Sequence, residues 1–132
     1  MKSRYQNSQR ILWNMQSACF FLSLLSVAEE YNNDKVDLLD AARYCMNKGW
    51  ADAEYFISND VEILKWLTGK RVTKTFVFEK GKCPLMKDNQ FSIEKWERDG
   101  KYHFRRRYFD VYEGSRTVAE GNFVCYYIYT IG

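Results

Sequence analysis

Residues 16–30 read Gln-Ser-Ala-Cys-Phe-Phe-Leu-Ser-Leu-Leu-Ser-Val-Ala-Glu-Glu, and this stretch decides how the rest of the chain can be organised. It contains no glycine or proline, and Ser17 belongs to the residue types that cap helix N-termini. The pattern predicts a helix that begins at Ser17 and ends near residues 31–33. Its side chains are apolar almost all round, as is typical of a helix buried in a core.

One narrow stripe of this predicted helix is small and polar. At about 100° per residue, four side chains fall within roughly 60° of each other: Cys19, Ser23, Ser26 and Glu30. A cap at Ser17 places Cys19 in the first turn, where unpaired amide groups and the helix dipole favour a thiolate. Cys19 is therefore a candidate nucleophile. The alternative is that it is a small core residue, which is the commoner role of a cysteine in an apolar helix.

Length and composition indicate a single globular domain, residues 1–132. A chain of 132 residues can form a core without disulfides or a structural metal, and contents of 46% apolar and 17% aromatic residues argue against disorder. The net charge of +3 is too small to indicate nucleic-acid binding by itself. The apolar run after residue 17 is too short and polar to span a bilayer, so we expect no membrane partner.

The cysteines indicate neither a disulfide framework nor a metal site. They stand at positions 19, 45, 83 and 125, without a Cys-x-x-Cys pair and with a single histidine, His103. We therefore expect no metal, no cofactor and a reducing compartment, with Cys45 and Cys125 in the core. The basic N-terminal segment imitates a signal peptide, but Gln16 and two serines interrupt its apolar run, which favours a cytoplasmic protein.

The sequence pattern changes from helical to extended at about residue 71. Two further helices are predicted, over about residues 34–47 and 59–68, and Phe56 in the preceding loop is expected to point inward. Strands are predicted over residues 71–78, 91–97, 101–112 and 122–131, the last one central, with a hairpin turn at Asp99-Gly100. Helices followed by antiparallel strands predict an α+β domain in which a helical layer packs on one sheet.

If Cys19 is a nucleophile, the residues that activate it must come from later in the chain. A thiol nucleophile requires an imidazole within hydrogen-bond reach, and that imidazole requires an orienting acceptor. His103 is the candidate base and Asp110 the candidate acceptor. In an unbroken strand these two would point to opposite faces, so a bulge between them is required. Gln16, three residues before the cysteine, has the place of a side-chain amide that stabilises an oxyanion in papain-type hydrolases.

The three consecutive arginines, residues 105–107, allow three interpretations. They can keep an exposed strand edge soluble, which is the commonest role of such a run. Arg105 and Arg107 share the His103 face of the strand and could bind a carboxylate or phosphate of a substrate. With the aromatic residues around them, the arginines could instead form a platform for single-stranded nucleic acid.

A resemblance adds to these patterns. It is carried by Gln16-x-x-Cys19-Phe-Phe-Leu-Ser-Leu-Leu, Lys48-Gly49, Leu67-Thr68-Gly69-Lys70, His103-Phe104, and Asp110 with Gly114-Ser115-x-Thr117-Val118-x-x-Gly121. From about residue 11 to its end, the chain resembles a family of uncharacterised phage, prophage and spirochaete-plasmid proteins, which are themselves similar to papain-like peptidases of the C39-like kind. The resemblance implies a papain-like fold with Cys19 as nucleophile, Gln16 at the oxyanion, His103 as base and Asp110 orienting it.

Two functions remain open at this point. The first is a papain-like cysteine hydrolase, a peptidase or isopeptidase that acts on a peptide or protein substrate without a cofactor. The second is a catalytically inactive member of the same fold, a phage- or plasmid-encoded binding module for a protein or nucleic acid. The arginine run, and Asp110-Val111 in place of the Asp-Pro of the family pattern, favour the second; the intact Gln16, Cys19 and His103 favour the first.

Overall fold

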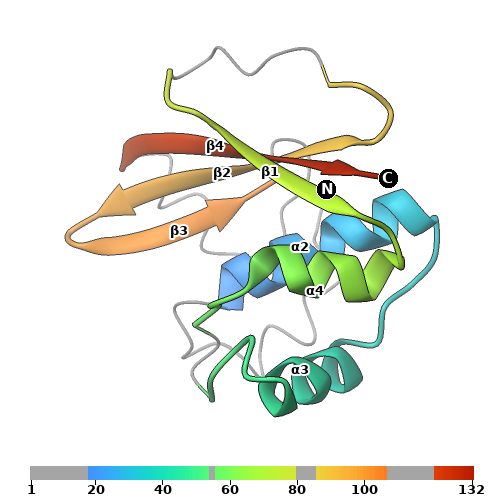
Figure 1. Ribbon diagram of the computed structural model, residues 1–132. Coiled ribbons are helices and arrows are strands. Elements are labelled where there is room, and N and C mark those ends of the chain that lie inside the picture. The colour runs from blue at the N-terminus through green and yellow to red at the C-terminus, as the bar shows by residue number, and fades with distance from the viewer. Residues whose placement is uncertain (1–17, 54–55, 80–85, 107–120) are drawn as a thin grey trace.

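A four-stranded antiparallel sheet packs on a layer of helices. The computed structural model describes residues 18–53, 56–79, 86–106 and 121–132. In these residues the helices are α2 (Ala18–Asn32), α3 (Leu38–Asn47) and α4 (Asp60–Thr68), and the strands are β1 (Val72–Val77), β2 (Gln90–Arg98), β3 (Lys101–Arg105) and β4 (Asn122–Ile131). Figure 1 shows the sheet on one side of α2 and α4, with α3 beyond α4 on the other. The α+β class predicted from the sequence is therefore confirmed.

The helix that was predicted to begin at Ser17 is α2, and its place at the centre of the core explains its apolar character. Most of its side chains are fully buried, among them Phe21, Leu22, Leu24 and Leu25. At about 25 cal/mol per Å² of apolar surface, each such residue contributes roughly 1.5–3 kcal/mol. α2 packs against α4 on one side and against β3 on the other. Within the described part of the chain, no helix is long and apolar enough to cross a membrane.

The second helix begins later than its periodicity suggests. We predicted a start at about Asp34, but α3 begins at Leu38, because Asp37 caps it by accepting a hydrogen bond from the Asp40 amide at 2.9 Å. Before the cap, the amide of Val36 donates to the Glu29 carboxylate of α2 at 2.8 Å. These side-chain acceptors compete with the helical hydrogen bonds and hold residues 34–37 as a connection.

The sheet has the order β1-β4-β2-β3, so the last strand of the chain is central, as predicted. All its pairings are antiparallel, and the β2–β4 register shifts between Lys95 and Trp96. The predicted hairpin turn is confirmed at Asp99 and Gly100, whose φ angles of 53° and 77° suit the type I′ turn that joins β2 to β3.

The expectation for Phe56 was wrong. Its side chain is 59% exposed, whereas the neighbouring Ile57 packs against the core. Cys45 and Cys125 are both buried, in agreement with their predicted core positions. The core itself is formed by α2, the inner faces of α3 and α4, and one face of the sheet.

Candidate functional site

The polar stripe of α2 faces the edge strand β3. The backbone N–H of Phe104 donates a hydrogen bond to the Sγ atom of Cys19 at 3.4 Å. Further along the helix, the guanidinium of Arg106 donates to the Ser26 hydroxyl at 3.2 Å and to the Glu30 carboxylate at 2.5 Å. The stripe that the helical wheel singled out is therefore the surface on which the end of β3 docks.

Cys19 lies at this seam with only 2% of its surface exposed. The backbone amide of Phe104 in β3 lowers its pKa, and so do the amides of Phe20 and Cys19, as expected for a cysteine at a helix start. Burial has the larger effect, because it removes the solvation of the thiolate, and it raises the pKa of Cys19 from 9.0 to about 11. The thiol is therefore protonated at neutral pH.

His103 lies next to Phe104 in β3, but its side chain belongs to the other face of the sheet. The Phe104 ring stacks on Phe20 of α2 with centroids 4.2 Å apart, so Phe104 points toward the helices. Side chains alternate along a strand, so His103 points away from them and lies opposite Trp96 of β2. Burial, with the nearby charge of Arg105, lowers the pKa of His103 from 6.5 to about 4. A neutral thiol and a neutral imidazole on different faces do not form the ion pair that the hydrolase hypothesis requires.

The arginine run divides between the two faces. Arg105, on the His103 face, forms an ion pair with Glu94 of β2 at 2.7 Å, and its guanidinium lies 5.2 Å from the Trp96 ring. The carboxylate that Arg105 was predicted to bind in a substrate is thus supplied by the chain itself. Arg106 does not fit the interpretation of an exposed, charged strand edge, because it is only 7% exposed and its guanidinium pairs with Glu30 of α2.

The other predicted site residues lie outside the described residues. This applies to Gln16, Asp110 and Arg107, whose roles stay predictions. Among the described residues, no group of three histidine, cysteine or acidic side chains is arranged to hold a metal ion.

A second surface, formed by aromatic and lysine side chains, lies on the helix-facing side of the sheet, partly in contact with α2 and α4 and partly beyond them. We call it the aromatic–lysine surface. Its members are Lys74 and Phe76 from β1, Phe78 directly after β1, Lys95 from β2, Tyr102 and Phe104 from β3, and Tyr127 from β4. Figure 1 shows the β2–β3 hairpin projecting beyond α2 and α4 at this end. Three of its rings are well exposed: Phe76 (49%), Phe78 (70%) and Tyr102 (53%).

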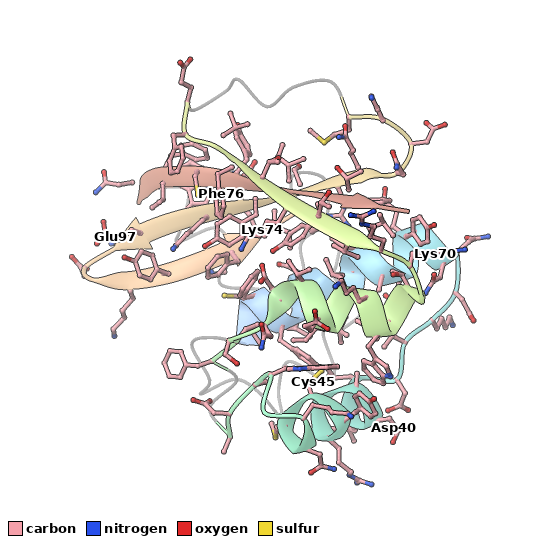
Figure 2. The ribbon with its side chains drawn as sticks, in the orientation of Figure 1. Asp40, Cys45, Lys70, Lys74, Phe76 and Glu97 are labelled. Carbon is pink, nitrogen blue, oxygen red and sulfur yellow. The ribbon has the colours of Figure 1, made fainter. Side chains whose placement is uncertain are left out.

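The lysines connect these rings across the four strands. The Nζ atom of Lys74 lies 3.8 Å from the centroid of Tyr127 and 5.0 Å from that of Phe76, its labelled neighbour in Figure 2. The Nζ atom of Lys95 lies 4.2 Å from the Tyr102 centroid and 5.7 Å from that of Tyr127. Cation–π attraction of this kind holds ammonium groups over ring faces. The surface therefore presents flat apolar rings with positive charges between them.

The two lysines differ in how far their charge is compensated. Lys74 forms an ion pair with Asp60, the first residue of α4, at 2.6 Å, and the same carboxylate oxygen accepts a hydrogen bond from Tyr129 at 2.6 Å. Lys95 has no ion-pair partner among the described residues, so its charge is available to a ligand.

Sequence analysis did not assign this surface. The sequence predicted a strand over residues 71–78, and aromatic stacking was considered only around the arginines. The available signal was a lysine, Lys74, that alternates with Phe76 and Phe78 on one face of the predicted strand. Comparisons with protein-family models, curated proteins and solved structures found no match to the chain.

Proposed function

We propose that this protein is a binding module that takes up single-stranded nucleic acid on its aromatic–lysine surface. The observation that carries the proposal is the set of exposed rings, Phe76, Phe78 and Tyr102, joined across one sheet face by Lys74 and Lys95. Nucleobases stack on such rings whatever their identity, while ammonium groups pair with the phosphates between them.

The geometry favours a single strand over a duplex. Stacking needs unpaired bases, because the faces of paired bases are already occupied in the double helix. The surface spans four strands, or about 14 Å at roughly 4.8 Å per strand, which suits two or three stacked bases. With one uncompensated lysine and a net charge of +3, binding should be sequence-tolerant and only moderately dependent on salt.

Fluorescence anisotropy with short labelled oligo-dT and oligo-U tests the proposal. Phe76→Ala and Tyr102→Ala should each weaken binding about 5- to 150-fold, since base–aromatic stacking is worth about 1–3 kcal/mol per base. Phe56→Ala is the matched control, because Phe56 is also an exposed ring, 59% accessible, but lies outside this surface. The proposal fails if wild-type protein ignores the oligonucleotides at low salt, or if both surface variants bind as tightly as the control.

The predicted papain-like hydrolase is the second candidate, and one observation favours it. The N–H of Phe104, on the strand that carries His103, donates to the Cys19 sulfur, and the amides of Phe20 and Cys19 at the helix start also lower the pKa of this thiol. A papain-like site uses such amides to stabilise an oxyanion. Catalysis would require β3 to turn so that His103 reaches the thiol. The test is the pH dependence of Cys19 alkylation in wild type and in His103→Ala. The hydrolase is supported only if the alkylation pKa of Cys19 changes when His103 is removed.

A further inference from the structure

Asp60, the first residue of α4, borders the aromatic–lysine surface. Its Oδ2 atom lies 2.6 Å from the Nζ atom of Lys74, and the same oxygen accepts a hydrogen bond from the Tyr129 hydroxyl at 2.6 Å. The helix that carries Asp60 packs against β1, which carries Lys74, and Figure 1 shows the two elements side by side. An acidic side chain is thus held against one of the two lysines of this surface.

The surroundings fix this carboxylate in place. Tyr129 is fully buried, and burial together with the charge of Asp60 raises the pKa of its hydroxyl well above 10, so Tyr129 keeps its proton and donates it to Asp60. The side chains of Lys74 and Asp60 are only 18% and 17% exposed. Salt screens a partly buried ion pair much less than a solvent-exposed one. Asp60 is therefore a positioned acid whose pair with Lys74 persists at ordinary salt concentrations.

The ammonium of Lys74 does not need Asp60 to stay at the surface. Its Nζ atom lies 3.8 Å from the ring centroid of Tyr127 and 5.0 Å from that of Phe76, and the attraction of a cation to a ring face involves no carboxylate. A phosphate that joins bases stacked on these rings would approach the same ammonium that Asp60 already contacts. The carboxylate and the phosphate therefore compete for one cation.

We propose that Asp60 is an internal competitor that weakens nucleic-acid binding by occupying Lys74. This inference rests on the proposed function, because it assigns a regulating residue to the same surface. The contrast between the two lysines supports it. The Nζ atom of Lys95 lies 4.2 Å from the Tyr102 centroid, and Lys95 has no ion-pair partner among the described residues. One lysine then pairs with a phosphate in the wild type, and two do so when Asp60 is neutral.

The salt dependence of binding gives the size of the effect. For a single strand, the logarithm of the binding constant falls with the logarithm of the salt concentration, with a slope of about −0.7 for each phosphate neutralised. Removing the charge of Asp60 should therefore steepen the slope by about 0.7. Counted as counterion release alone, relative to about 1 M salt, one extra contact tightens binding about eightfold at about 50 mM salt and about threefold at about 200 mM.

Fluorescence anisotropy with labelled oligo-dT, between about 50 and 200 mM salt, measures this effect. Asp60→Asn should bind more tightly than the wild type and with a steeper slope, and Asp60→Asn/Lys74→Met should lose the gain. Glu62→Gln is the matched control. It removes the same charge from the same helix, but Glu62 pairs with Lys65 at 3.2 Å and lies outside the surface, so its affinity and slope should match those of the wild type.

A merely structural role of Asp60 predicts the opposite result, because a loosened surface binds its ligand more weakly. Asp60→Ser is a second variant in case Asp60→Asn does not fold, since serine is favourable at helix starts and its hydroxyl can accept the hydrogen bond of Tyr129. Circular dichroism at the assay temperature shows which of the two variants is folded. A gain in affinity in either folded variant, lost on Lys74→Met, supports the proposal.

The possible results separate this inference from the proposed function. If the wild type binds and no folded Asp60 variant binds more tightly or with a steeper slope, the inference is overturned and nucleic-acid binding stands. An equal gain in Glu62→Gln also overturns it, since the effect would then be one of net charge. If neither the wild type nor the Asp60 variants bind oligo-dT, the proposed function fails and the inference fails with it.

Discussion

Cys19 should resist alkylation in the folded protein, and the structure sets the size of the effect. At about pH 8 a thiol with a pKa of 9.0 is roughly one-tenth ionised, whereas one with a pKa of about 11 is roughly one-thousandth ionised. Because the thiolate is the reacting species, this difference alone slows alkylation about 100-fold. Burial of all but 2% of the residue slows it further, since the reagent must wait for local opening.

The assay is reaction with iodoacetamide over a range of pH, read by mass spectrometry of the peptide that contains Cys19. The reference is the same cysteine in the urea-unfolded chain. Cys45 is an internal control, because it is also fully buried with a pKa of about 11, so it reports whether the fold stays closed. His103→Ala should leave the Cys19 rate unchanged, because the imidazole lies on the other face of the sheet.

Reaction of Cys19 below about pH 7, with Cys45 still protected, would refute this reasoning. If His103→Ala then moved the titration toward an ordinary thiol value, a thiolate–imidazolium pair would exist in solution. The hydrolase would become the leading function, and a screen of peptide substrates would follow.

Three further perturbations follow from the buried polar groups. Because burial lowers the pKa of His103 to about 4, its contribution to stability is complete above pH 6.5 and is lost as pH falls from 6.5 to about 4. The free energy of unfolding in urea should therefore fall by about 3 kcal/mol across this range, and in His103→Gln it should depend much less on pH. Glu30→Gln leaves the guanidinium of Arg106, 7% exposed, without its anionic partner, and urea unfolding should show a loss of about 1–3 kcal/mol, moderated by the 43% exposure of Glu30. Asp60→Asn weakens the acceptor that Tyr129 and Lys74 share, so the midpoint of thermal unfolding should fall by an amount that corresponds to about 1–3 kcal/mol. An unchanged midpoint would show that water replaces the lost interactions of Tyr129 and Lys74.

The polar stripe on α2 shows how far a helical wheel can lead. The wheel correctly placed Cys19, Ser26 and Glu30 on one side of a buried helix, because that spacing is local geometry. It could not show what lies across from them. Arg106 is 76 residues from Glu30 in the sequence, and only the pairing of β2 with β3 brings it there.

The thiol illustrates the same limit in electrostatics. The amides at the helix start lower the pKa of Cys19, as the sequence predicted, since they belong to the helix itself. Desolvation outweighs them, and desolvation depends on β3 covering the helix start. The faces of His103 and Arg105 were likewise decided by the strand register and not by their distance from Cys19 along the chain.

The sequence by itself determined the order of helices and strands, the hairpin turn at Asp99-Gly100, the central last strand and the buried helix, because periodicity and turn chemistry act over a few residues. The tertiary structure alone decided which end of the sheet the helices leave open, which edge is covered, and which rings are exposed. These features depend on how far each helix extends over the sheet. The aromatic–lysine surface comes from that mismatch in extent between the sheet and the helices.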